Sequence, residues 1–90
     1  MTYTVVWSKN AQDELMRFWM ESSSRGPVTR AADAVDATLR FDPVLRGETY
    51  TVSTRLLKIW PLAVIYRVVE QDRLARVLSI HPITQFSADD

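Results

Sequence analysis

The fold of this chain is decided by one stretch, RLLKIWPLAVIYRVVEQDRLARVLSI, which runs from Arg55 to Ile80. It contains three short apolar runs, separated by two turn signals at Trp60-Pro61 and at the polar segment Glu70-Gln-Asp-Arg73. β-Branched and aromatic residues dominate these runs, which is typical of strands. The connections are too short for a crossover helix, so neighbouring strands must be antiparallel. The stretch therefore predicts a three-stranded antiparallel meander.

One strand and two helices are predicted ahead of the meander. Tyr3–Trp7 has the alternating pattern of a strand, and Ser8 after it is a residue type that caps helix N-termini. Apolar residues then recur at helical spacing over Lys9–Ser22 and again over Pro27–Arg40. Asp42-Pro43 ends the second helix, because the residue before a proline disfavours helical backbone angles. We expect an α+β fold in which an N-terminal strand and a helical hairpin pack on a small antiparallel sheet.

The two faces of the meander are assigned by parity, because successive side chains of a strand point to opposite faces. The face expected to lie under the helices carries Val64, Tyr66, Val68, Leu78 and Ile80. The other face carries Arg67, Ser79 and His81, together with the apolar Ile65, Val69 and Val77. A face that mixes cations with this much apolar surface is predicted to bind a ligand or to be covered by another segment.

Composition limits the classes of function. Ninety residues suffice for one domain, which we assign to residues 1–90. The formal net charge is zero, unlike that of a typical nucleic-acid-binding domain, although Pro43–His81 holds six of the eleven cations and three of the eleven acids. With no cysteine, one histidine and two glycines, no metal site, cofactor or phosphate-binding loop is expected. No signal peptide or membrane span is recognisable, so we expect a cytoplasmic protein.

Several segments resemble those of one protein family. The chain opens with Tyr3-x-Val5-x-Trp7-Ser8-x-x-Ala11-x-x-x-Leu15, and its second helix ends at Leu39-x-x-Asp42-Pro43 ahead of Gly47-Glu48. The meander holds Pro61-Leu-Ala-Val-Ile-Tyr-Arg-Val68 and Val77-Leu-Ser-Ile-His81. In this order, the segments resemble the RelE/ParE toxin superfamily of bacterial type II toxin–antitoxin systems, which includes plasmid stabilisation proteins. The resemblance covers nearly the whole chain. It implies two helices on one face of a small antiparallel sheet, and a cognate antitoxin as partner.

The resemblance also implies a site. Metal-independent RNA cleavage uses the 2′-hydroxyl as nucleophile, and needs a base, cations around the phosphate and an acid for the leaving oxygen. The family's nucleases have basic residues on the first meander strand, an arginine three positions before the tyrosine of the second, and a basic or aromatic group near the end of the third. Here the arginine position is Ala63, whose side chain cannot bind phosphate. The remaining candidate catalytic residues are Lys58, Arg67, His81 and Arg55.

Three functions follow as alternatives. The first is a RelE-like toxin that inhibits translation through the ribosome and mRNA, by endoribonuclease action. The second is a ParE-like inhibitor of DNA gyrase, which needs no nuclease residues. The third is a non-catalytic relative that only binds its antitoxin, through an antitoxin helix with apolar anchors. Purely structural roles remain open for the candidates, since His81 can be an ordinary strand-end residue and Arg67 a solvated or cross-strand-paired arginine.

Overall fold

The first strand leads directly into the first helix at Ser8. The computed structural model describes residues 2–23 and 25–83, and in it β1 spans Thr4–Trp7 and α1 spans Lys9–Glu21. The Ser8 hydroxyl accepts a hydrogen bond from the Ala11 N–H at 3.0 Å and so caps α1, as predicted. The second helix, α2, spans Arg25–Phe41, so it begins two residues earlier and ends one residue later than the sequence predicted.

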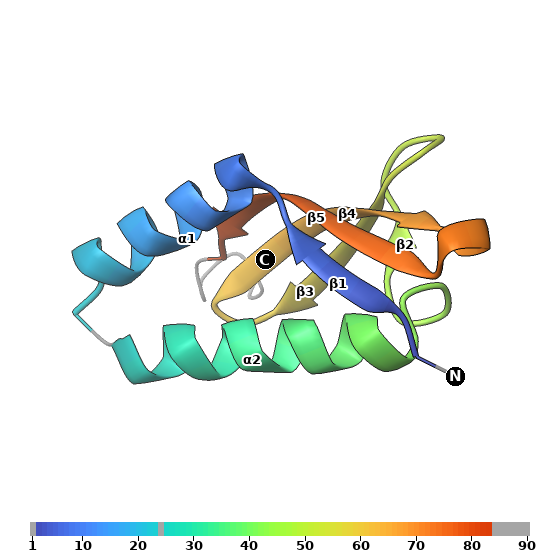
Figure 1. Ribbon diagram of the computed structural model, residues 1–90. Coiled ribbons are helices and arrows are strands. Elements are labelled where there is room, and N and C mark those ends of the chain that lie inside the picture. Colours follow the sequence, from blue (N-terminus) through green and yellow to red (C-terminus); the bar gives the residue numbers. More distant parts are fainter. Residues whose placement is uncertain (1, 24, 84–90) are drawn as a thin grey trace.

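The predicted meander is present and belongs to a larger sheet. β3 (Arg55–Ile59), β4 (Leu62–Val69) and β5 (Leu74–Pro82) are antiparallel neighbours, with a single 3₁₀ turn, η1 (Glu70–Asp72), between β4 and β5. A short strand, β2 (Glu48–Thr49), pairs with the outer edge of β3. β1 pairs with β5 in parallel, so the five-stranded sheet is mixed, in the order β1-β5-β4-β3-β2. The α+β architecture is thus confirmed, with one parallel pair that the sequence did not indicate (Figure 1).

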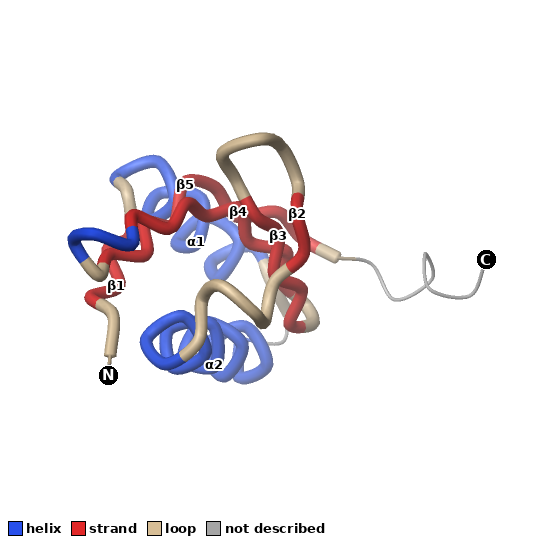
Figure 2. The backbone as a smooth tube through the Cα atoms, turned by 90° about the vertical axis from the view of Figure 1, so that its right-hand side faces the viewer, coloured by secondary structure: helices blue, strands red, loops and turns tan. Residues whose placement is uncertain are grey.

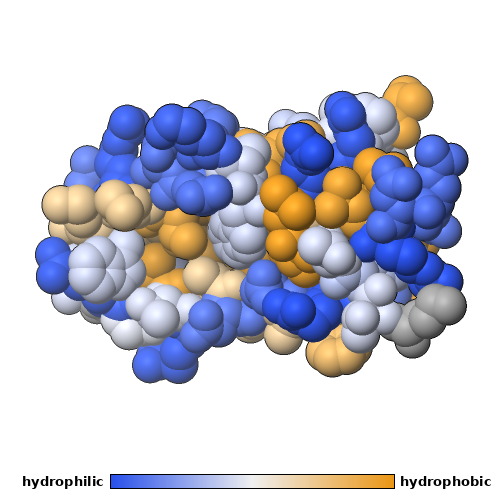
Figure 3. Space-filling model, viewed as in Figure 1, coloured by the Kyte–Doolittle hydropathy of each residue, from blue (hydrophilic) through white to orange (hydrophobic). Residues whose placement is uncertain are grey.

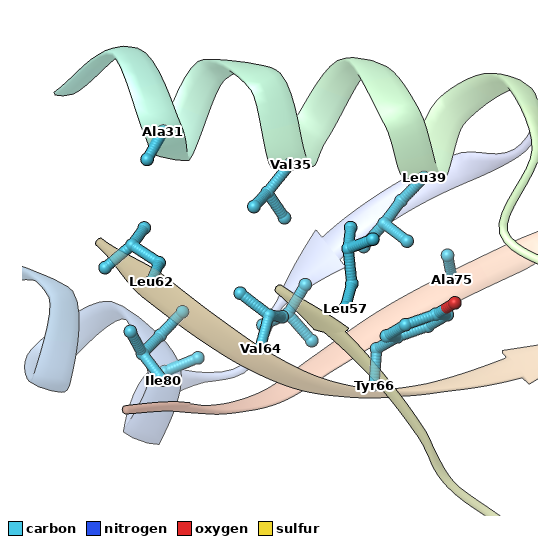
Figure 4. Packing of buried hydrophobic residues seen from close by; sticks show 11 residues of the cluster. Ala31, Val35, Leu39, Leu57, Leu62, Val64, Tyr66, Ala75 and Ile80 are labelled. Carbon is cyan, nitrogen blue, oxygen red and sulfur yellow. The ribbon is translucent and has the colours of Figure 1, made fainter. Parts of the chain in front are cut away.

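The helical hairpin supplies one wall of the core. α1 packs mainly along β5, while α2 crosses β1, β3 and β4 (Figures 1 and 2). The buried face of α2 contains Val28, Ala31, Val35 and Leu39, which recur at helical spacing. Figure 4 shows Ala31, Val35 and Leu39 directed from the helix toward Leu62, Val64 and Leu57 of the sheet. This packing closes one face of the sheet, and both helices of residues 2–23 and 25–83 lie on that side.

Tyr66 lies at the centre of the closed side, with 0 % of its surface exposed. Its hydroxyl donates a 2.7 Å hydrogen bond to the Pro43 carbonyl, which ties β4 to the segment that follows α2. Gly47 approaches the same hydroxyl so closely that an added Cβ would overlap it and crowd the Leu56 carbonyl. The predicted core position of Tyr66 is therefore confirmed, and the loop that carries Gly47 packs against it.

Two assignments to the sheet faces are wrong because β5 contains a bulge. Ile65 pairs with Ser79, but the next residue, Tyr66, pairs with Val77, so Leu78 is an additional residue on β5. Val77, expected on the other face, is fully buried in the core. Leu78, expected in the core, is half-buried and lies outside the buried cluster. The prediction is confirmed for the other core residues of the meander, since Val64, Tyr66 and Ile80 are buried and Val68 packs against them.

Candidate functional site on the outer sheet face

The face of the sheet turned away from the helices, here called the outer face, mixes apolar and basic side chains. Leu56 pairs with Ile65, and Ile65 with Ser79, so these three form one row across β3, β4 and β5, and all are half-buried. Such a row offers apolar contact area without forming a closed core. The cations lie on either side of this row along the strands.

Lys58 and His81 flank Ala63 in the next row. Lys58 is the register partner of Ala63 on β3, and His81 is its partner on β5. Adjacent strands lie about 4.8 Å apart, so the Lys58 and His81 backbones are separated by about 10 Å with only the small alanine side chain between them. Both flanking side chains are exposed. The row therefore carries an ammonium and an imidazole on either side of a short side chain.

Two contacts orient these groups. The Ser79 hydroxyl and His81 Nε2 are 3.1 Å apart, which fixes the imidazole by a hydrogen bond on the outer face. Lys58 Nζ lies 3.8 Å from Glu48 Oε2, and both side chains are largely exposed. An exposed ion pair of this kind is weak, so the lysine can exchange its carboxylate partner for a ligand phosphate at small cost.

The other two predicted site residues lie apart from this row. Arg67 is on the outer face, four residues along β4 from Ala63, which corresponds to about 13 Å. Arg55 pairs with the buried Tyr66 and therefore points to the opposite face, where its Nη2 donates a 2.5 Å hydrogen bond to the Gly47 carbonyl. The structure thus brings Lys58 and His81 together and separates both arginines from them.

Arg76 is a further basic residue of the outer face that sequence parity did not find. It is the register partner of Arg67, and its neighbours in the chain, Ala75 and Val77, are both fully buried. Without the bulge at Leu78, parity places Arg76 on the helix-covered face. The sequence contains no turn or glycine signal near this bulge, so the position of Arg76 became visible only in the structure.

A second surface feature is an apolar groove between the two helices and β1. The groove has a volume of about 770 Å³, and its lining includes Val5, Leu15, Met16, Trp19 and Val28. Figure 3 shows the hollow and the apolar residues that gather there. Trp19 and Met16 are 38 % and 63 % exposed, which is unusual for large apolar side chains that could pack in a core.

Two kinds of site are absent from residues 2–23 and 25–83. No group of three or more histidine, cysteine, aspartate or glutamate side chains there is placed to hold a metal ion. Neither helix in that part of the chain is long and apolar enough to cross a membrane.

The comparisons with known proteins identify the fold. No protein-family model matches the sequence. No curated protein matches it either. The toxin–antitoxin complex RelBE2 from Mycobacterium tuberculosis contains a chain that superposes with a TM-score of 0.76 at 14 % identity, covering 91 % of this chain and 92 % of that one. The chain has the RelE/ParE fold. A chain of the chromosomal ParDE toxin–antitoxin system from P. aeruginosa superposes with a TM-score of 0.64 at 15 % identity, covering 91 % and 97 % of the two chains.

The RelE/ParE fold also occurs outside toxin–antitoxin complexes. TrmO from Pseudomonas aeruginosa superposes with a TM-score of 0.61 at 21 % identity, covering 89 % of this chain but only 35 % of TrmO. At these identities the likeness concerns the fold alone, and function has to be argued from the residues of this chain.

Proposed function

We propose that this chain is the toxin of a type II toxin–antitoxin pair, and that it blocks translation by binding and cleaving mRNA on the outer sheet face. The observation that carries the proposal is the row formed by Lys58, Ala63 and His81. It combines a flexible cation with an imidazole on an open face, about 10 Å apart across three strands. A cation at the phosphate and a group that transfers a proton are two of the contributions that metal-independent RNA cleavage requires.

The proposed reaction is an internal transfer at phosphorus. The RNA 2′-oxygen attacks the adjacent phosphorus, the bond from phosphorus to the 5′-oxygen breaks, and a 2′,3′-cyclic phosphate and a free 5′-hydroxyl result. His81 carries out one of the two proton transfers, as base for the 2′-hydroxyl or as acid for the leaving 5′-oxygen, and solvent water carries out the other. Lys58 stabilises the negative charge that develops on the phosphate oxygens. Ala63 contributes space and no charge, so the positive charge at the phosphate comes from Lys58.

Arg55 has no part in this proposed mechanism. Its guanidinium is held by the Gly47 carbonyl on the helix-covered side of the sheet. Arg67 is on the correct face but about 13 Å from Ala63 along β4, so it can bind a neighbouring part of the RNA and cannot contact the reacting phosphate. The proposed catalytic residues are therefore Lys58 and His81.

The proposed antitoxin contact is the apolar groove between α1, α2 and β1. The exposed Trp19 and Met16 provide the apolar anchors that an amphipathic antitoxin segment needs. Asp33 lies among the groove residues, so a basic side chain beside the apolar face of that segment would be favoured. The groove shares only Val6 with the described rows of the outer face, so substitutions at other positions allow antitoxin binding and RNA binding to be tested separately.

Tightly controlled induction with parallel pulse labelling of protein and DNA synthesis tests the proposal. Protein synthesis is expected to stop first. In a translating extract, Lys58→Ala or His81→Ala should slow mRNA cleavage by about 100-fold or more, because general acid–base and charge-stabilising groups contribute effects of that size. Lys9→Ala is the matched control, since Lys9 is an exposed lysine of α1. Cleavage at the original rate in both outer-face variants would overturn these roles.

Gyrase inhibition is the second candidate, and Ala63 is the observation that favours it. The resemblance implies an arginine there for nuclease action, whereas a gyrase inhibitor needs only protein-binding surfaces. In this case DNA synthesis stops first and the purified chain inhibits supercoiling by gyrase. If neither synthesis is affected, while a partner encoded nearby binds the groove, the chain is a non-catalytic antitoxin-binding relative.

A further inference from the structure

The bulge in β5 sets two arginines directly opposite each other. Arg67 on β4 and Arg76 on β5 are register partners on the outer face, and both side chains are exposed. Directly opposed residues of an antiparallel pair have Cβ atoms about 5 Å apart. The two positive charges therefore repel each other in the free protein, and this repulsion is relieved when an anion lies between them.

Neither arginine is neutralised within the described residues. The ion pairs there involve other residues, and the side chains of Arg67 and Arg76 form no hydrogen bond or cation–π contact with a described residue. The third side chain in the same row, Val6 of β1, is apolar. Glu70 is the acid that lines a surface pocket together with Arg67, but it makes no ion pair with it. The pair thus keeps ten N–H donors available for a ligand.

A pocket with both polar and apolar lining continues the surface from Arg67. Its volume is about 360 Å³. Besides Arg67 and Glu70, its lining contains hydroxyl-bearing residues of β2 and of the loop before β3, together with three valines: Thr49, Thr51, Ser53, Thr54, Val44, Val52 and Val68. The same pocket includes Arg55, whose Nε is buried and has no hydrogen-bond partner among the described atoms. Hydroxyl and guanidinium donors converging on one depression are suited to an oxyanion.

We propose that Arg67 and Arg76, with the adjoining hydroxyl-lined pocket, bind a backbone phosphate of an RNA strand that lies across the outer face. The inference rests on the proposed function and adds a second phosphate site to it. Arginine binds phosphate through two parallel hydrogen bonds, so an opposed pair can hold one phosphate from two sides.

The pattern of the outer face favours a nucleic-acid strand over an acidic peptide. The arginine pair and the Lys58–Ala63–His81 row are separated by the apolar row that contains Leu56 and Ile65. Charged rows about 13 Å apart with apolar surface between them match a chain whose charges repeat and whose bases present flat apolar faces. RNA bound in this way is fixed at a position beside the reacting phosphate.

Fluorescence anisotropy with a short 5′-labelled single-stranded RNA, measured from 50 to 200 mM salt, tests the proposal. Arg67→Gln and Arg76→Gln should each weaken binding by about three- to tenfold and lower the slope of log affinity against log salt by about 0.7. Arg17→Gln on α1 removes the same charge from an exposed position outside the sheet and should change neither value. Equal affinities for all three variants would overturn the proposal, as would binding of polyglutamate in place of RNA.

Thermal unfolding separates ligand binding from a structural role. Arg76→Gln should leave the Tm of the free protein unchanged or slightly higher, because a repulsion is removed. RNA should raise the Tm of the unsubstituted chain by more than that of this variant. Loss of stability in the free Arg76→Gln protein, with no change in RNA affinity, would overturn the binding role.

The two proposals fail in different ways. If translation stops in cells but RNA affinity does not change when Arg67 or Arg76 is substituted, the second phosphate site is overturned and the toxin assignment remains. If RNA affinity depends on both arginines but translation continues in cells that express the chain, the phosphate site is supported and the assignment to translation is overturned.

Discussion

The two faces of the same sheet differ in what their side chains do. On the helix-covered face, Val64, Tyr66 and Val77 have no exposed surface and contact α2 or one another. On the outer face, Ile65 is only half-buried and lies between exposed cations such as Lys58 and Arg67. Successive residues of one strand therefore have different roles: those on the covered side stabilise the fold, and those on the outer side are available to contact a ligand. Substitutions one position apart should separate the two effects.

The largest difference is expected between a core leucine and an outer-face leucine. Leu39 of α2 has 0 % of its surface exposed, so Leu39→Ala should lower the free energy of unfolding by about 3–4 kcal/mol through lost burial and a cavity. Leu56 on the outer face is half-buried, and Leu56→Ala should cost about 1 kcal/mol. Urea unfolding of both variants measures the contrast. Similar losses for the two would mean that the outer face is covered in solution.

A smaller contrast tests the bulge. Val77→Ala should lower the free energy of unfolding by about 2 kcal/mol, because Val77 is fully buried. Leu78→Ala removes a larger side chain but should cost only about 1 kcal/mol, because Leu78 is half-buried and lies outside the core cluster. If β5 had no bulge, strand parity would place Leu78 in the core, and Leu78→Ala would then lower the free energy of unfolding more than Val77→Ala. That order in urea unfolding would remove Arg76 from the outer face, and with it the proposed arginine pair.

The helices and strands were predictable because their signals are local. Helical spacing of apolar residues, the cap at Ser8 and the stop at Asp42-Pro43 each act within a few residues of sequence. The face on which Arg55 lies could also have been predicted from the sequence. A two-residue turn at Trp60-Pro61 makes Ile59 and Leu62 partners, and counting outward from them pairs Arg55 with Tyr66, as observed.

The bulge, by contrast, depends on contacts between distant parts of the chain. The Leu78 carbonyl accepts hydrogen bonds from the Ser8 hydroxyl and from the Asn10 side-chain amide, which come from the start of α1. A residue whose carbonyl is used in this way is displaced from regular pairing with β4, and strand parity cannot detect the displacement. The same limit explains why His81 was not placed opposite Ala63 and why the Arg67–Arg76 pair was not identified, because both depend on the register between β4 and β5.

A third contrast concerns a single hydroxyl between the core and the loop after α2. Tyr66→Phe keeps the ring and removes the donor to the Pro43 carbonyl, so it should lower the free energy of unfolding by about 1–2 kcal/mol. Tyr3→Phe is the control, because the Tyr3 hydroxyl makes no hydrogen bond to another described residue, and it should cost less than about 0.5 kcal/mol. RNA affinity should be unchanged in both variants, since Tyr66 faces the helices. If Tyr66→Phe weakens RNA binding while stability is kept, the two faces of the sheet are coupled, and stability and ligand contact cannot be assigned to separate sides of β4.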